Sequence, residues 1–475
     1  MLDLDNEVLR PLREGAFKLD CTNILLDGRY HGKSVTFSGP GYIEQSPDKG
    51  FNATIFVKGS PQDAPGNDGQ ICGLPGTLVS SEGVLKLEAT DLRGQKWLAE
   101  NIWRPGSDGC VPGDRYVVRC SFHELLVECS QPSAITMAGE ADLELFIRGS
   151  VHLPLSNGKS IELRGWAEDG GASTPRVTKL IAVTFQAGNL EFELFNHAGW
   201  FHLRAKGNVD QPNIISRVYE ALLFSLATPE SWSVAAVSKC GKQQTRVRSP
   251  RKQLFDAGQW PPILFRSSPP IENFWQLFCL YLEYAFQEKE KPLHPLSAQV
   301  LAVSRSGGAS LEAQTLALVV AVEAIVNRFY ADIANPTDAH RGDVGNLIKH
   351  IKNWNGNERI RVRAVGAVGS ISRARASDRL ESLVQKGAVS EPGTRLWKKL
   401  RDQAAHGDWS KLHDSLQAHI DQMGAVRTLF YQLIFHLIGY TGLQTDYGTH
   451  GYPILFGTGC AGNSDAYANE KVAKI

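Results

Sequence analysis

The main change in the spacing of apolar residues along this chain falls at a proline-rich segment that runs from Trp260 to Pro270. Before it, short stretches are rich in β-branched and aromatic residues, and residues 190–194 alternate strictly between apolar side chains and glutamate. Such alternation is typical of a half-buried strand. After it, apolar residues recur every three or four positions, as in amphipathic helices. Because prolines continue neither element, we expect a multidomain protein whose main boundary lies here.

Residues 1–260 are predicted to form a mostly antiparallel β domain, either a sandwich or a barrel-like structure. The clearest strands are expected at residues 117–127, 143–155, 161–166, 177–185 and 190–194, with a tight turn at 187–189. A helix at 214–226 and a hairpin at 233–249 follow. The glycine- and proline-rich loop at 59–75 is long enough to serve as a binding loop.

The hairpin at the end of this domain is strongly basic. Its cations are Lys239, Lys242, Arg246, Arg248, Arg251 and Lys252. Two interpretations stay open for it. The charges belong to a solvated edge strand and discourage pairing with other chains, or they form a strip that binds phosphate.

Residues 271–445 are predicted to form an all-α helical bundle. Helical stripes of apolar residues cover 274–286, 311–330, 346–354, 359–385, 393–406 and 412–438. The second of these is apolar almost all round, which predicts a buried central helix. Residues 446–475 are expected to be a C-terminal tail. Within it, residues 457–462 spell a dinucleotide-binding fingerprint, but they lack the βαβ unit that such a site needs.

Charge and cysteine content place few limits on the function but several on the class of protein. The chain has 50 basic and 50 acidic residues, so no global field favours nucleic acid or membranes. The acidic N-terminus lacks the features of a signal peptide and no apolar run reaches membrane-spanning length, so we expect a cytoplasmic protein without a membrane partner. The eight cysteines lack paired short spacings, as expected of reduced thiols. Cys110, Cys120, His123 and Cys129 come closest to a zinc set. Cys120 and His123 would point to opposite faces of a strand, so no metal or cofactor is expected.

The candidate site lies between Arg401 and His406, at the end of the helix predicted for residues 393–406. Trp397 and Leu400 belong to the apolar stripe of this helix, whereas Arg401 and His406 do not. On an ideal helix their side chains diverge by roughly 140°. Arg401 and His406 can therefore share a cleft only at its rim, or if a second copy of the helix completes the site.

Arginine and histidine suit RNA cleavage without a metal ion. The reaction needs a base for the 2′-hydroxyl proton, an acid for the leaving 5′-oxygen, and a cation for the phosphate as charge builds on it. Histidine titrates near neutrality, and a guanidinium grips two phosphate oxygens at once. Asp402 is placed to orient Arg401 or a histidine from a second subunit. These three residues are the candidate catalytic group.

The charge around Arg401, Asp402 and His406, which we call the motif, is basic although the chain as a whole is neutral. Between His340 and His406 there are 14 lysines and arginines against six acids. This excess favours a phosphate-bearing partner. The RNA-binding candidates are Lys398, Lys399, Arg395, Arg359, Arg361 and Arg363. The last three alternate with Ile360 and Val362, which leaves a loop or strand-like edge open beside a helix face. No aromatic residues interleave with these arginines, so base stacking is not expected.

These features resemble the HEPN superfamily (higher eukaryotes and prokaryotes nucleotide-binding). The closest likeness is to its ApeA-like branch. The resemblance rests on the Arg401–His406 spacing, on Ala321-Val322-Glu323 in a helix, and on a closing helix followed by Gly439-Tyr440-Thr441-Gly442. Position 402 is aspartate here, where asparagine is also common in the family. The resemblance implies a metal-independent ribonuclease in anti-phage defence by abortive infection, with transfer RNA among its candidate substrates. We expect a homodimer, because one copy offers a single histidine while acid and base catalysis need two proton-transfer groups.

Two other functions stay open beside the ribonuclease. One is a catalytically inactive HEPN bundle that binds nucleotide or protein. The other is a ligand-binding β protein with a helical dimerisation domain. If the ribonuclease interpretation holds, residues 1–260 are expected to restrain it and to bind the trigger, which the anti-phage role implies is phage-derived. An unregulated ribonuclease would damage its own cell.

Overall fold

The computed structural model describes most of the chain, in two compact units. The described residues are 5–30, 33–46, 50–58, 84–111, 115–129, 142–148, 159–169, 172–197, 199–226, 232–239, 242–249, 263, 272–406 and 415–456. The first unit comprises residues 1–219 and 230–254, and the second comprises residues 220–229 and 255–475. We call them the β unit and the helical unit.

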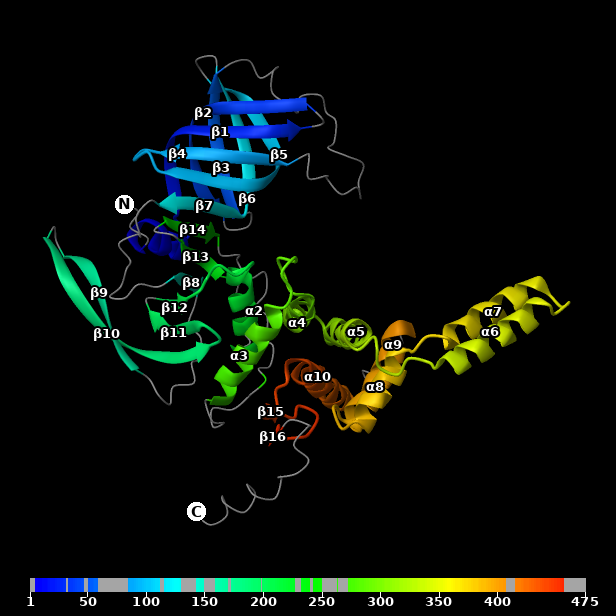
Figure 1. Cartoon of the computed structure of the whole chain (residues 1–475). Helices are drawn as coiled ribbons and strands as arrows, with labels where there is room; N and C mark the ends of the chain where they lie inside the picture. Colours follow the sequence, from blue (N-terminus) through cyan, green and yellow to red (C-terminus); the bar gives the residue numbers. More distant parts are fainter. Residues whose placement is uncertain are drawn as a thin grey trace, which may run out of the picture. The chain divides into compact units, whose positions relative to one another are not determined.

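The β unit is built on one large antiparallel sheet (Figure 1). Its strands are β1 (Lys18–Tyr30), β2 (Lys33–Ser46), β3 (Gly50–Lys58), β4 (Leu85–Asp91), β5 (Lys96–Val111), β6 (Arg115–Phe122), β7 (Glu124–Cys129), β8 (Leu143–Arg148), β9 (Lys159–Asp169), β10 (Ala172–Ala187), β11 (Leu190–His197), β12 (Trp200–Gly207), β13 (Trp232–Lys239) and β14 (Lys242–Arg248). Within the described residues, these fourteen strands pair in the order β4-β1-β2-β3-β6-β5-β7-β14-β13-β8-β12-β11-β10-β9. The predicted combination of an N-terminal antiparallel β domain and C-terminal helices is confirmed.

The first six strands close on themselves. β4 pairs with β1 on one side and with β5 on the other, so β4-β1-β2-β3-β6-β5 form a ring. Side chains that point into it, among them Ile24, Phe51, Ile55 and Trp97, are buried. Burying large apolar side chains is the main stabilisation available to such a ring. Of the two predicted arrangements, this part of the β unit is therefore the barrel-like one.

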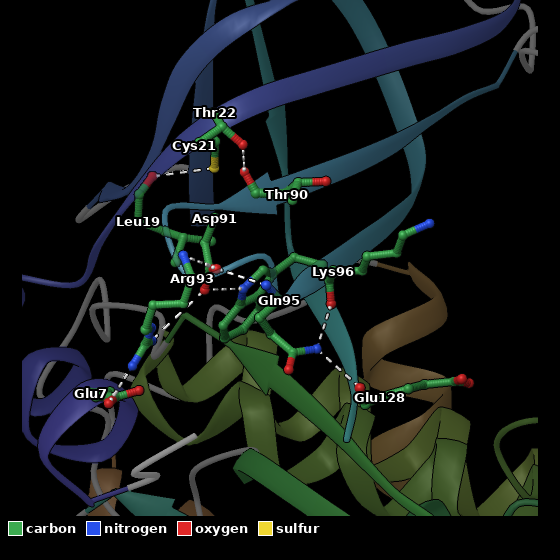
Figure 2. Close-up of polar contacts among 11 residues, drawn as sticks. Glu7, Leu19, Cys21, Thr22, Thr90, Asp91, Arg93, Gln95, Lys96 and Glu128 are labelled. Atoms are coloured by element: carbon green, nitrogen blue, oxygen red, sulfur yellow. Dashed lines mark hydrogen bonds and ion pairs between the residues drawn. The ribbon is translucent and has the colours of Figure 1, made fainter. Parts of the chain in front are cut away.

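The turn between β4 and β5 is anchored by Asp91 (Figure 2). Its Oδ1 accepts hydrogen bonds from the backbone N–H groups of Arg93 and Gln95, at 2.9 and 2.8 Å. Its Oδ2 accepts one from Trp97 Nε1 at 3.3 Å. Arg93 also forms an ion pair with Glu7 near the N-terminus. A buried carboxylate with this many donors is satisfied, so we regard the cluster as structural.

Several local predictions for the β unit can be compared with the strands. Residues 187–189 form the expected tight turn, with Gly188 at φ 57° and Ala187 opposite Leu190 in the β10–β11 pair. Residues 117–127 are not one strand, because the strand is interrupted at His123, between β6 and β7. The loop at 59–75 lies outside the described residues.

The basic hairpin is not a sheet edge. Its strand β14 pairs with β13 on one side and with β7 on the other. Arg246 and Arg248 both form ion pairs with Glu124, at 3.2 and 2.8 Å, and Arg248 also lies over the ring of Trp232. The edge interpretation is therefore wrong. These two arginines are also already engaged, which weakens the phosphate-binding interpretation.

The described part of the helical unit contains eight complete helices, α3 to α10, where the sequence predicted six helical segments. After α1 (Arg10–Glu14) and α2 (Ile214–Leu226), the helices are α3 (Glu272–Ala285), α4 (Pro295–Arg305), α5 (Leu311–Phe329), α6 (Asp338–Lys352), α7 (Glu358–Ile371), α8 (Ala376–Gln385), α9 (Glu391–His406) and α10 (Leu416–Ile438). The sequence did not predict α4. The single segment at 359–385 is two helices, α7 and α8. Arg359, Arg361 and Arg363 lie in α7, so the loop or strand-like alternative for them is wrong.

α5, α9 and α10 form the centre of the helical unit. α10 is buried along most of its length. On α10, the Nε2 atom of His419 lies 2.9 Å from Thr315 Oγ1 of α5, within hydrogen-bond distance. The predicted central helix α5 is not buried on every side. Leu318, Val322 and Ile325 are buried, but Leu316 and Val320 on another face are 47% and 53% exposed.

The end of the described chain packs back on α10. β15 (Leu443–Thr445) pairs with β16 (Ile454–Phe456). Between them, Tyr447 is buried and its N–H donates to Thr428 Oγ1 at 2.9 Å. A Cβ on Gly424 would lie 2.1 Å from the Tyr447 carbonyl oxygen, so this position requires glycine. The segment expected to be a tail therefore begins with packed structure, while residues 457–475 lie outside the described part.

Candidate functional site

The helix that carries the motif is fixed by its apolar face. Trp397 and Leu400 are buried, and Trp397 Nε1 donates a hydrogen bond to the Val319 carbonyl of α5 at 3.0 Å. A buried indole with its N–H satisfied fixes both the position and the rotation of α9 against α5. Arg401 lies one turn after Trp397, so the packing of Trp397 also fixes the backbone position of Arg401.

Arg401 is held by Glu323 of α5. Its Nε donates to Glu323 Oε2 at 2.9 Å and its Nη2 donates to Oε1 at 3.0 Å. This is the side-on bidentate pair, the arrangement in which a guanidinium and a carboxylate fix each other's orientation. Hydrogen bonding to Glu323 raises the pKa of Arg401, so the guanidinium stays charged. The Arg401 side chain is 44% exposed, and its Nη1 is not used by Glu323.

The other two motif residues lie on a different flank of α9. Asp402 is exposed, with its Oδ1 3.8 Å from Arg401 Nη1. His406 is the last residue of α9. Its side chain lies outside the part of the structure that is described. By helical position, 406 shares a face with 402, 399 and 395, while Arg401 turns toward α5.

The predicted RNA-binding cations fall into two separate groups. Arg395 and Lys399 are exposed on α9, and Lys398 forms an ion pair with Glu381 of α8. Arg359, Arg361 and Arg363 lie on α7, which packs on α6 and extends away from α8 and α9 in Figure 1. The structure therefore brings the first group to the motif and not the second.

Two residues of interest were missed as site candidates. In the sequence, Glu323 stands out only as part of Ala321-Val322-Glu323. A carboxylate in the apolar middle of a helix is itself a signal of a functional or paired residue. Trp354 stands between the cations of α6 and α7, and its carbonyl accepts a hydrogen bond from Arg361 Nη1 at 3.1 Å. No aromatic residue interleaves with these arginines along the chain, but the fold brings Trp354 next to Arg361.

The described residues offer neither a metal site nor a membrane-spanning helix. This part of the chain holds no group of three or more histidines, cysteines and acids that could bind a metal ion. Cys120 is buried, which raises the pKa of its thiol to about 12, whereas His123 is exposed. Within the same described residues, no helix has the length and apolarity needed to cross a membrane.

Comparisons with known proteins leave the family open. No family model, no curated protein and no solved structure matches this chain. The function therefore has to be inferred from the chain's own residues.

Proposed function

We propose that this chain is a metal-independent endoribonuclease of the HEPN type, in which Arg401 and His406 carry the chemistry. The observation that supports it best is the side-on pair between Glu323 and Arg401. It fixes a guanidinium at the motif and leaves Nη1 for a phosphate oxygen, which is the preorganisation that stabilises developing charge. Glu323 acts as a positioning residue.

In the proposed reaction, the 2′-hydroxyl attacks the adjacent phosphorus and the 5′-oxygen leaves. His406 transfers protons, Arg401 holds the phosphate, and Asp402 helps to orient Arg401. Arg395, Lys398 and Lys399 on α9 would contact neighbouring phosphates. The products are a 2′,3′-cyclic phosphate and a free 5′-hydroxyl.

We also propose that a second copy of the chain completes the site. Arg401 turns toward α5, whereas position 406 lies on another flank of α9, roughly 140° away on an ideal helix. Leu316 and Val320 are exposed on the face of α5 that carries Glu323. An exposed apolar surface of this kind is typical of a partner interface. A two-fold axis through it would bring the histidine of one copy to Arg401 of the other.

The biological role that we propose is anti-phage defence by abortive infection in the cytoplasm, with transfer RNA among the candidate substrates. It rests on the motif resemblance and on a β unit distinct from the unit that carries the motif. That unit would bind a phage-derived trigger. Cells that express the chain should then restrict phage only while Arg401 is intact, which a plaque assay with Arg401→Ala measures.

The biochemical test is cleavage of mixed transfer and ribosomal RNA in EDTA. Arg401→Ala and His406→Ala should abolish cleavage. Glu323→Gln should lower kcat more than it raises KM, because it loosens Arg401 without removing it. Arg401→Ala should cost under about 1 kcal/mol of stability, since the pair that it breaks is partly exposed. Matched controls are Arg305→Ala and His450→Ala, which alter exposed residues away from the motif.

Three outcomes would overturn the assignment. Full activity in both motif variants would place the site elsewhere, and a requirement for Mg²⁺ would replace the mechanism. RNA or nucleotide binding without any cleavage would identify a catalytically inactive bundle instead. That alternative has one observation in its favour, since Glu323 already neutralises Arg401.

A further inference from the structure

The hairpin formed by α6 and α7 buries very little of its surface. Val344 is the only buried residue within the bounds of α6, and α7 has none. The two helices pack on each other and extend from the rest of the helical unit (Figure 1). Residues 353–357 connect them at the tip. Because this helix pair has so small a core, packing within the chain does not explain the composition of its surface.

The tip of this hairpin is strongly basic. From 349 to 363 the cations are Lys349, Lys352, Arg359, Arg361 and Arg363, and the single carboxylate is Glu358. Among the described residues, Lys349, Lys352, Arg359 and Arg363 form no ion pair, whereas Arg341 nearer the base is paired with Asp338 at 3.1 Å. Uncompensated like charges repel each other and are stabilised when a polyanion binds.

Trp354 lies among these charges and is 47% exposed. A Cβ on Gly356 would lie 2.2 Å from its ring, so the indole rests directly on the glycine backbone. Arg361 holds the same residue by donating to its carbonyl. One side of the ring is thus supported by the turn while part of its surface faces solvent. A rigid exposed aromatic ring suits stacking by a planar ligand.

We propose that the α6–α7 tip binds single-stranded RNA, with Trp354 stacking on a base and Lys349, Arg359 and Arg363 contacting phosphates. Cations together with an exposed aromatic ring are the combination that binds unpaired nucleotides. In a duplex the base faces are covered by their neighbours, so Trp354 would have no stacking partner there. The inference rests on the proposed ribonuclease function for its purpose, and it names the substrate class as unpaired RNA.

Binding can be measured without cleavage by using a ligand that cannot react. A labelled 2′-O-methyl oligouridylate lacks the attacking hydroxyl, and fluorescence anisotropy with the full chain gives its Kd. Trp354→Ala should weaken binding about tenfold, and Trp354→Phe should recover most of it. Combined Lys349→Ala, Arg359→Ala and Arg363→Ala should reduce the slope of log Kd against log salt by about 2. Arg305→Ala, an exposed cation outside the hairpin, is the matched control and should change neither value.

The comparison ligands decide between the possible outcomes. A duplex of the same length should bind more weakly than the single strand and should be insensitive to Trp354→Ala. Equal Kd values for the parent, Trp354→Ala and the triple variant would overturn the inference. So would variants that change self-association in light scattering but leave RNA binding intact, since the tip would then bind another copy of the chain. Hairpin-dependent binding in a chain that never cleaves RNA would support the inference while overturning the proposed function.

Discussion

At the residue scale, the β unit contains a carboxyl group in an unfavourable place. Glu144 on β8 is almost fully buried, next to Arg204 at 3.3 Å and His202 at 3.7 Å. Burial raises the pKa of Glu144 to about 7 even though Arg204 opposes the shift. Burial likewise lowers the pKa of His202 well below its usual value. Desolvation therefore outweighs ion pairing at Glu144, whereas at His202 the positive charge of Arg204 adds to the lowering of the pKa.

This arrangement makes the stability of the β unit depend on pH. The Glu144 pKa is higher in the folded chain than the ordinary 4.5, so the folded state holds a proton that the unfolded state has lost. The resulting stabilisation is complete below about 4.5 and is lost as the pH rises through 7. Glu144→Gln cannot ionise, so its melting temperature should exceed that of the parent by several degrees at pH 8 and match it near pH 5.

Glu191→Gln is the matched control, because Glu191 is exposed on β11. Thermal unfolding of the three proteins at both pH values checks the prediction. A Glu144→Gln chain less stable than the parent at pH 8 would mean that the ion pair with Arg204 outweighs the cost of burial.

The motif illustrates what the sequence predicts at this scale and what it does not. Arg401 and His406 are recognisable because their spacing is local to one helix. Glu323 is 78 residues away from Arg401 along the chain, and their pairing depends on how α9 packs against α5. The Trp397 hydrogen bond to Val319 sets that packing. Periodicity within each helix contains no information on which helices meet or in what rotation.

At the element scale, α5 is the helix whose sequence was most misleading. Its apolar residues predicted burial all round, yet Leu316 and Val320 are exposed within one chain. Apolar composition does not distinguish a surface that the chain itself buries from one that a partner would cover. The excess of apolar surface on α5 is thus the element-scale argument for a homodimer.

Val320→Glu should disrupt the proposed homodimer. A charge placed in the centre of an apolar interface has to be desolvated without a partner, which costs several kcal/mol. We expect light scattering to show a dimer for the parent and a monomer for the variant, with RNA cleavage lost in parallel. Leu92→Glu is the control, because Leu92 is also an exposed apolar residue but lies in the β unit. An active monomeric parent would contradict the prediction.

Element boundaries were predictable only where a local signal marks them. The break between α7 and α8 has such a signal, although the apolar pattern alone predicted a single helix there. Asp378 Oδ2 accepts a hydrogen bond from the Arg375 backbone N–H at 2.8 Å and so caps the start of α8. Helix α4 begins at Pro295, and the His294 ring accepts from the Leu296 N–H at 3.1 Å. Histidine is a rare N-cap, and the short, weakly apolar helix after it gave no clear stripe.

At the scale of the whole molecule, the division into units does not follow the chain simply. The second half of α2 belongs with the helices although it precedes β13 and β14. Phe224 stacks on Tyr281 with 4.5 Å between ring centroids, and it also contacts Tyr431 and Phe435. Glu220 accepts hydrogen bonds from the His294 N–H and from Ser297 Oγ, at 3.2 and 2.7 Å. No sequence pattern assigns a helix to a distant unit.

This discontinuity affects any test of whether the β unit restrains the proposed ribonuclease activity. A fragment of residues 265–475 carries the motif, but it lacks Phe224 and Glu220. Tyr281 and Phe435 would then lose a buried partner, and the His294 N–H and Ser297 would lose an acceptor. An inactive fragment of this kind would reflect a damaged core as readily as a missing activator. The contribution of α2 therefore has to be measured in the full chain.

Phe224→Ala should destabilise the helical unit by about 3–5 kcal/mol, the usual cost of removing a buried phenylalanine. Hydrogen exchange read by mass spectrometry locates the effect, since peptides of α3 and α10 should lose protection while peptides of β1 to β6 keep theirs. Phe195→Ala is the matched control. Phe195 is as deeply buried, but it lies on β11, so its loss should weaken the sheet and leave α3 and α10 protected. If Phe224→Ala instead exposed only strands of the β unit, α2 would belong energetically to that unit throughout its length. The fragment of residues 265–475 would then be a fair test of restraint after all.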